Sequence, residues 1–215
     1  MNENPKNNQN YVIAIGRQCG SGGREVGQRV AQLLDINYFD KQLLLEASRV
    51  SGIHPEMFEA ADERTPKFFP SLWPLNLAMA GSTFVGEAAT TEDNVYKAQC
   101  QVMKDLVTRK SCVIVGRTAD YVLRDYCHVI SVFLHAPIDD RVKRIIERGD
   151  CETREAAEKR SDKINKLRAE YYNFYTDKLW GHADSYDLCI DSSQLDIEGT
   201  AQFIVEYVKR RLEQL

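Results

Sequence analysis

The chain has 215 residues, of which 43% are hydrophobic and 28% are charged, and its formal net charge is −4. This length suits one domain with a small insert, and the composition is that of an ordinary globular protein. The slight negative charge gives no reason to expect nucleic acid as a general partner.

Three features indicate where the protein works. Residues 1–10 are polar, so we expect a disordered tail and not a signal peptide, which needs an apolar stretch. The most apolar segment, 68–85, is interrupted by Pro70, Pro74 and Gly81, which argues against a membrane span. The six cysteines form no CxxC pair, which favours free thiols in a reducing cytoplasm. We therefore expect a cytoplasmic protein with no membrane partner.

The first elements are a strand, a glycine-rich turn and a helix. The apolar run 11–15 predicts a buried strand, and the spacing of Val26, Val30 and Leu34 predicts one face of a helix. The turn between them holds four glycines, Gly16, Gly20, Gly22 and Gly23. Backbone N–H groups in such a turn, together with the positive end of the helix, hold a phosphate group.

The spacing within this loop leaves two ligands open. The usual nucleoside triphosphate loop is GxxxxGK followed by Ser or Thr, whereas Gly23 and Arg24 stand at those last two positions here. The glycine pattern also suits a dinucleotide, and Asp40 lies 20 residues after Gly20, where a ribose-binding acid is expected.

Strand and helix patterns alternate through the rest of the chain. We predict further strands at 36–39, 112–115, 129–134 and 186–190. We predict helices at 41–50, 55–61, 92–108, 138–148, within the charged stretch 149–180, and at 197–212. This alternation predicts an α/β fold, with five parallel strands and helices on both faces of the sheet.

Ligands of such sheets bind beyond the carboxyl ends of the strands. The candidate site therefore combines the segments that follow the strands: the loop 16–24, Asp40 with Lys41, Gly116 with Arg117, and the stretch 191–193 that contains Ser192.

Basic residues near these positions suit a phosphorylated ligand. Arg117 directly follows a predicted strand, and its guanidinium can bind a phosphate through two hydrogen bonds. Arg141, Arg144 and Arg148 are spaced by three and four residues, so they share a helix face. A cationic face that closes over phosphates is what phosphoryl transfer needs.

Taken together, four motifs resemble those of the cytidylate kinase-like family within the P-loop nucleoside monophosphate kinase group. They are AIGRQCGSGGR at 14–24, VGRTAD at 115–120, RVKRIIER at 141–148 and YDLCIDSS at 186–193. The resemblance implies a three-layer P-loop kinase fold with strand order 2-3-1-4-5. It also implies one domain over 11–215, with a helical acceptor-binding insert at 41–110 and a basic lid at 149–180.

The resemblance also implies roles for individual residues. ATP phosphates would be bound by the loop and by the last strand's end, at Gly20, Ser21, Gly22, Gly23, Arg24 and Ser192. The acceptor would be bound by Asp40, Lys41, Arg117 and Asp120. The transferring phosphoryl group would be stabilised by Arg24, Arg144, Arg148, Arg160 and Arg168.

The activity implied is phosphoryl transfer from ATP, with Mg²⁺, to CMP or dCMP, and a homo-oligomer is compatible with it. No protein side chain is singled out as a metal ligand. A dehydrogenase of the short-chain type is disfavoured, because no tyrosine has a lysine four residues later. Since the loop lacks its lysine, two alternatives stay open: a nucleotide-binding protein without kinase activity, and a P-loop kinase for a non-nucleotide small molecule.

Overall fold

A computed structural model describes residues 10–40 and 85–214, with side chains of the second part from residue 96 onward. The predicted helices 41–50 and 55–61, Lys41, most of the proposed insert and most of the proposed N-terminal tail lie outside the described residues.

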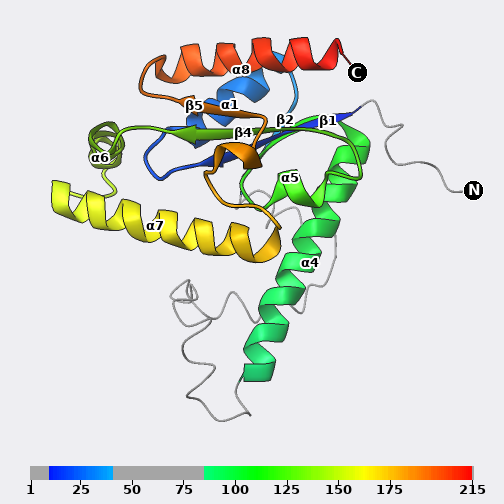
Figure 1. Cartoon of the computed structure of the whole chain (residues 1–215), viewed down its shortest axis with the longest axis horizontal. Helices are drawn as coiled ribbons and strands as arrows, with labels where there is room; N and C mark the ends of the chain where they lie inside the picture. The colour runs from blue at the N-terminus through cyan, green and yellow to red at the C-terminus, as the bar shows by residue number, and fades with distance from the viewer. Residues whose placement is uncertain (1–9, 41–84, 215) are drawn as a thin grey trace, which may run out of the picture.

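The sheet has five parallel strands in the order β2-β3-β1-β4-β5, as the resemblance implied. Helices cover both of its faces (Figure 1). In chain order the elements are β1 (Tyr11–Arg17), α1 (Gly23–Leu34), β2 (Asn37–Phe39), α4 (Val85–Arg109), β3 (Cys112–Val115), α5 (Ala119–Val122), β4 (His128–His135), α6 (Ile138–Glu147), α7 (Arg154–Tyr175), the 3-10 turn η2 (Ala183–Ser185), β5 (Leu188–Asp191) and α8 (Asp196–Leu212).

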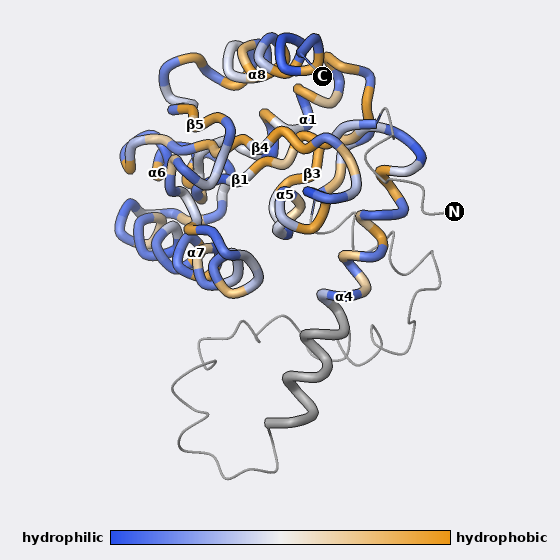
Figure 2. The backbone as a smooth tube through the Cα atoms, turned by 45° about the vertical axis from the view of Figure 1, so that its right-hand side comes forward, coloured by the Kyte–Doolittle hydropathy of each residue, from blue (hydrophilic) through white to orange (hydrophobic). Residues whose placement is uncertain are grey.

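Two apolar cores hold the layers together, because successive side chains of a strand point to opposite faces. Ile13 and Ile15 of β1 pack with Val26 of α1 and Ile204 of α8 on one face. Val12 and Ala14 face the opposite way and pack among residues of α4 and α5. Figure 2 shows the strands as the most hydrophobic part of the tube, with more hydrophilic residues on the outer helices.

All five predicted strands are present, and the ends of four of them differ from the prediction, while β3 has the predicted bounds. β1 continues for two residues beyond the predicted 11–15, so Gly16 and Arg17 belong to the strand. β5 begins at Leu188, two residues later than predicted. The helix predicted at 92–108 is longer, since α4 begins at Val85, and the four-residue helix α5 was not predicted at all.

A separate group of helices lies at the carboxyl end of the sheet. α6 follows β4, and α7 starts near α6 and runs below the sheet toward α4 (Figure 1). A small apolar cluster of Cys19, Val142, Ile145 and Ala157 joins both helices to the glycine-rich loop. None of the helices in the described part of the chain is both long enough and apolar enough to cross a membrane.

Candidate active site

The glycine-rich loop joins the end of β1 to the start of α1. Gly20 and Gly22 have φ values of +83° and +76°, a conformation that glycine adopts without steric cost. Gly22 caps α1 without any side-chain hydrogen bond, so the first N–H groups of the helix have no intrahelical acceptor. These groups make the loop suited to an anion.

Neighbouring elements hold the loop in this shape. The Gln18 amide donates to the carbonyl of Leu134 on β4 at 2.9 Å, and the Cys19 amide donates to Oδ1 of Asn165 on α7 at 2.7 Å. The Ser192 hydroxyl donates to the Ser21 carbonyl at 2.6 Å. The loop is therefore fixed by β4, by α7 and by the turn after β5.

Ser192 is predicted to bind ATP phosphates, and in the structure its side chain contacts the backbone of the loop. Arg144 lies beside it, with Nη2 donating to the Ser192 carbonyl at 3.1 Å and Nη1 to the Gly20 carbonyl at 3.4 Å. In this arrangement Arg144 joins α6 to the loop and to the end of β5.

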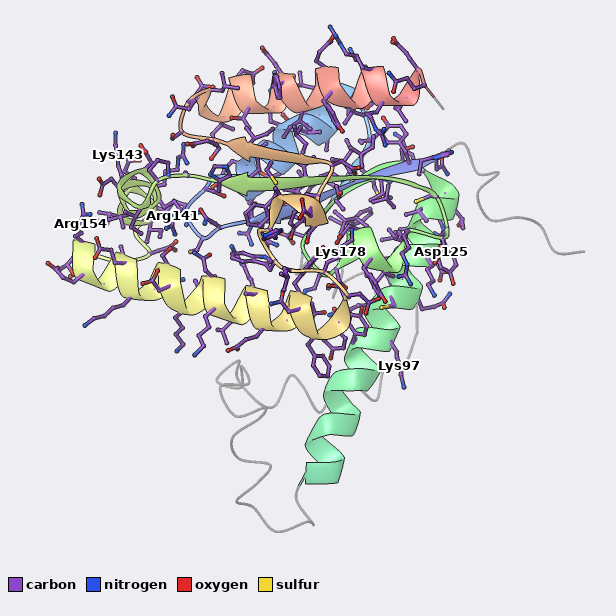
Figure 3. All side chains as sticks on the ribbon, viewed as in Figure 1. Lys97, Asp125, Arg141, Lys143, Arg154 and Lys178 are labelled. Carbon is purple, nitrogen blue, oxygen red and sulfur yellow. The ribbon has the colours of Figure 1, made fainter. Side chains whose placement is uncertain are left out.

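Arg141, Arg144 and Arg148, which the sequence spaces by three and four residues, do not form one cationic face in the structure. Arg141 is buried, donates to the Ala136 carbonyl at 3.0 Å and also bonds Ser161 of α7. It points from α6 toward α7, while Lys143 points away (Figure 3). Arg141 therefore holds the two helices together, and Gly20 packs so tightly against it that a Cβ on Gly20 would lie 2.5 Å from the Arg141 carbonyl oxygen.

Three arginines, which we call the inner arginines, gather around the loop: Arg17, Arg117 and Arg168. Within residues 10–40 and 96–214, no carboxylate lies within ion-pair distance of any of them. Arg168 of α7 donates from Nη1 to the Arg17 carbonyl at 3.0 Å. Arg117 lies over the ring of Tyr171, with 5.4 Å between its guanidinium carbon and the ring centroid.

The inner arginines act on each other electrostatically. Burial, and then the positive charges of Arg168 and Arg117, lower the pKa of Arg17 to about 9. Burial also lowers the pKa of Arg168, and the charges of Arg148 and Arg24 act in the same direction. Positive charge is thus concentrated at the loop in excess of the negative charge that the described residues supply.

The turn after β3 positions Arg117 in an uncommon backbone conformation. Gly116, Arg117 and Thr118 have φ values of +82°, +61° and +54°, and the last two are not glycines. Left-handed conformation costs such residues of the order of 1 kcal/mol each. The surrounding contacts sustain it, including a 3.1 Å hydrogen bond between the Thr118 and Tyr96 hydroxyls.

Other arginines, which we call the outer arginines, have acidic partners: Arg24, Arg148 and Arg154. Arg24 lies 3.2 Å from Asp40, and its side chain is 63% exposed. Arg148 lies between Asp150 at 3.0 Å and Glu25 at 3.6 Å. Two predicted site residues, Arg24 and Asp40, therefore pair with one another beside the loop.

Asp120 and Arg160 are two further residues of the sequence-based assignment. Asp120 is buried, accepts a hydrogen bond from Tyr172 at 2.7 Å and lies 3.5 Å from Lys178. Its carboxylate therefore joins α5 to the α7 region, and its assignment to the acceptor site stays a prediction. Arg160 is exposed on α7 and contributes none of the contacts to the loop described above.

Sequence reasoning gave no role to Arg17 in the site. The sequence shows Arg17 as a basic residue directly after Gly16, but it does not show in which direction the side chain points. The structure also shows an open depression of about 580 Å³ at the ends of β4 and β5, lined in part by Gln18, His135 and Asp191.

A Mg²⁺ ion would need oxygen ligands at this site. The described residues contain no group of three His, Cys, Asp or Glu side chains arranged to hold a metal ion. Mg²⁺ in kinases takes its ligands mostly from phosphate oxygens and water, with one or two from protein. A magnesium ion that arrives with its nucleotide is compatible with this loop, where Arg24 occupies the place of the usual hydroxyl ligand.

A comparison with family models decides the family. The model of the cytidylate kinase-like family matches residues 12–194, which include the loop, the inner arginines and Ser192. The chain belongs to the cytidylate kinase-like family. The suspected resemblance is thereby confirmed, although membership alone does not specify the acceptor. No curated protein matches the sequence.

Solved structures support a P-loop kinase fold for this family member. An uncharacterized protein from Eubacterium ventriosum is 27% identical, with a TM-score of 0.66, and the match covers 93% of this chain and 98% of that one. A gluconokinase from Sinorhizobium meliloti is 14% identical, with a TM-score of 0.52, covering 98% and 97%. Shikimate kinase from Bacteroides thetaiotaomicron is 14% identical, with a TM-score of 0.50, covering 93% and 98%. At these identities the two kinases indicate a shared fold only.

Proposed function

We propose that this protein transfers the γ-phosphoryl group of ATP to a nucleoside monophosphate, with CMP or dCMP as its preferred acceptor. The observation that carries the proposal is the set of inner arginines, which meet at the loop without carboxylate partners in the described part of the chain. Phosphoryl transfer depends on positioning and on neutralising spread negative charge, and unpaired arginines supply both.

In this proposal the loop from Gly20 to Gly23 and the start of α1 hold the phosphates of ATP, and Mg²⁺ neutralises part of their charge. Arg117 holds the phosphate of the acceptor, and Arg168 stabilises the group in transfer. Arg144 and Ser192 keep the loop in shape. Asp40 and Lys41 bind the acceptor, and the segment 149–180, which carries Arg160, forms the lid directly after Arg148.

The chemistry favours a phosphate acceptor over a hydroxyl acceptor. An oxygen of the acceptor phosphate forms the new bond to the γ-phosphorus, while the bond from this phosphorus to the β-bridging oxygen breaks and ADP leaves. A monophosphate oxygen is already anionic at pH 7, because the second pKa of a phosphate ester is near 6. A hydroxyl acceptor would need a base to take its proton.

Two carboxylates of the described site, Asp40 and Asp191, are already engaged. Asp40 is paired with Arg24, and Asp191 accepts a 2.9 Å hydrogen bond from the Ser193 amide. This bond helps to hold the pKa of Asp191 below its usual value, so the carboxylate is a weaker base. Both observations support the monophosphate as the acceptor.

The test is an ADP-formation assay with ATP, Mg²⁺ and a panel of acceptors. The panel contains CMP, dCMP, UMP and AMP, together with gluconate and shikimate, the substrates that the names of two fold relatives suggest. We expect turnover with CMP or dCMP above all others. Faster turnover of gluconate or shikimate than of any nucleotide would contradict the proposal and indicate a small-molecule kinase. ATP binding without turnover of any acceptor would indicate a nucleotide-binding protein without kinase activity.

A further inference from the structure

The side chain of Arg17 fills the space that a lysine at position 23 would enter. A Cβ on Gly23 would lie 2.6 Å from Cβ of Arg17 and 2.8 Å from its Cγ, closer than real Cβ atoms approach. A Cβ on Gly116 would lie 2.2 Å from Nη1 at the other end of the same side chain. Arg17 therefore extends from the end of β1, past the first residue of α1, to the end of β3.

From this geometry we infer that Arg17 is the residue that binds the triphosphate's terminal phosphates in place of the missing loop lysine. The usual lysine extends from the first turn of α1 to the β- and γ-phosphates. Arg17 starts from the opposite side of the loop, and its side chain crosses the same first turn. The two glycines, Gly23 and Gly116, are what leave its path clear.

The electrostatic surroundings of Arg17 support this role. Among the described residues, the charged groups that act on it are Arg168, Arg117 and Arg24, all positive, and the phenol of Tyr38 also contributes. The side chain is largely enclosed, and the described residues give it no counter-ion, which is unfavourable and favours the arrival of an anion. Burial and these charges lower the pKa of Arg17 to about 9, as expected where positive groups outnumber negative ones.

Arg24 is less suited to this role. It lies one position after Gly23, it is mostly exposed, and it is paired with Asp40. A helix turns by about 100° per residue, so a side chain at 24 points away from the direction of one at 23. We therefore assign the task of the missing lysine to Arg17 and not to Arg24.

The inference rests on the triphosphate half of the proposed function and not on the identity of the acceptor. Its first test is binding of ATP and of pyrophosphate, measured by calorimetry and as a ligand-induced rise in Tm. Arg17→Met keeps the aliphatic stem and removes the charge, while Arg210→Met, at the exposed end of α8, serves as the matched control. We expect Arg17→Met to weaken binding of both ligands at least about tenfold and the control to leave it unchanged.

A second test exchanges the position of the charge. Gly23→Lys alone collides with Arg17, so we expect it to bind ATP less well than the parent. Arg17→Gly alone loses the charge. The double variant Arg17→Gly/Gly23→Lys has a lysine at the usual position and free space beside it, so we expect it to bind ATP more tightly than either single variant, a coupling that purely structural damage would not produce.

The outcomes separate this inference from the proposed function. Arg17→Met with the parent's affinity for ATP and pyrophosphate, or a double variant worse than both single variants, would overturn the role of Arg17. A parent protein that binds neither ligand would overturn it as well. A parent that binds ATP through Arg17 but phosphorylates no acceptor would leave the inference intact and would contradict the kinase proposal alone.

Discussion

The inner and outer arginines show how two neighbouring regions use the same side chain differently. Arg24, Arg148 and Arg154 lie at the surface, each with an acidic partner 2.5–3.6 Å away. The inner arginines lie at the carboxyl ends of β1 and β3 and on α7, where the described residues provide no carboxylate. The presence of acidic partners, and not the number of arginines, separates the two regions.

This difference has energetic consequences. Exposed ion pairs contribute little to stability, because water and salt screen them and their long side chains lose freedom. An enclosed arginine without a counter-ion is unfavourable until an anion binds, so its charge adds to the affinity for that anion. We therefore expect changes to inner arginines to affect catalysis, and changes to outer arginines to affect little.

The largest effect is expected on α7, which carries one arginine of each kind. Arg168→Met removes an inner arginine that contacts the Arg17 carbonyl, and Arg154→Met removes an outer one paired with Asp139. We expect Arg168→Met to lower kcat about a hundredfold or more, the scale of one lost transition-state donor. Steady-state kinetics with the preferred acceptor measures this, and circular dichroism checks the folding of both variants.

Equal kcat values for Arg168→Met and Arg154→Met would remove the distinction between the two groups on this helix. An Arg168→Lys variant sharpens the result, because it retains the charge without the planar guanidinium. Partial recovery of kcat by lysine identifies charge as the requirement. A loss as large as that of methionine points to the geometry of the guanidinium.

A somewhat smaller effect is expected for Arg117, at the acceptor side of the group. Losing a buried, charge-assisted contact to the acceptor phosphate costs roughly 2–5 kcal/mol, at least about thirtyfold in kcat/KM. We expect Arg117→Met to lower kcat/KM for the acceptor by this amount and to leave ATP affinity within about twofold of the parent. Initial rates with varied acceptor, together with ATP calorimetry, test this separation. If ATP affinity falls in parallel, Arg117 serves the triphosphate or the fold.

The smallest effect is expected for Arg24, although its place in the sequence makes it the most obvious substitute for the loop lysine. Because its side chain is 63% exposed and paired with Asp40, we expect Arg24→Met to lower kcat less than about tenfold. The same assay with Asp40→Asn tests the partner. A hundredfold loss for Arg24→Met alone would move it into the inner group and would weaken the case for Arg17.

Much of the fold could be predicted from local pattern. Apolar runs marked the five strands, and the 3.6-residue period marked α1 and α8, because a sheet covered on both faces demands continuous apolar strands and one-sided helices. The glycines of the loop, followed by a helix, predicted a phosphate-binding turn. The order of the motifs was enough to suggest the family. The sequence did not predict the exact ends of β1 and α4, nor the short helix α5. A few residues at the end of an element, or a four-residue helix, show too little periodicity.

The sequence by itself determined the elements, the loop and the supply of basic residues near it. Only the tertiary structure decided which of these residues are free to meet a ligand. Asp120 meets Tyr172, 52 positions away, and Arg168 meets the Arg17 backbone across 151 positions. Whether Arg17 crosses the loop depends on two glycines, one at the start of α1 and one directly after β3. Such pairings arise from how distant segments pack, and no local pattern contains them.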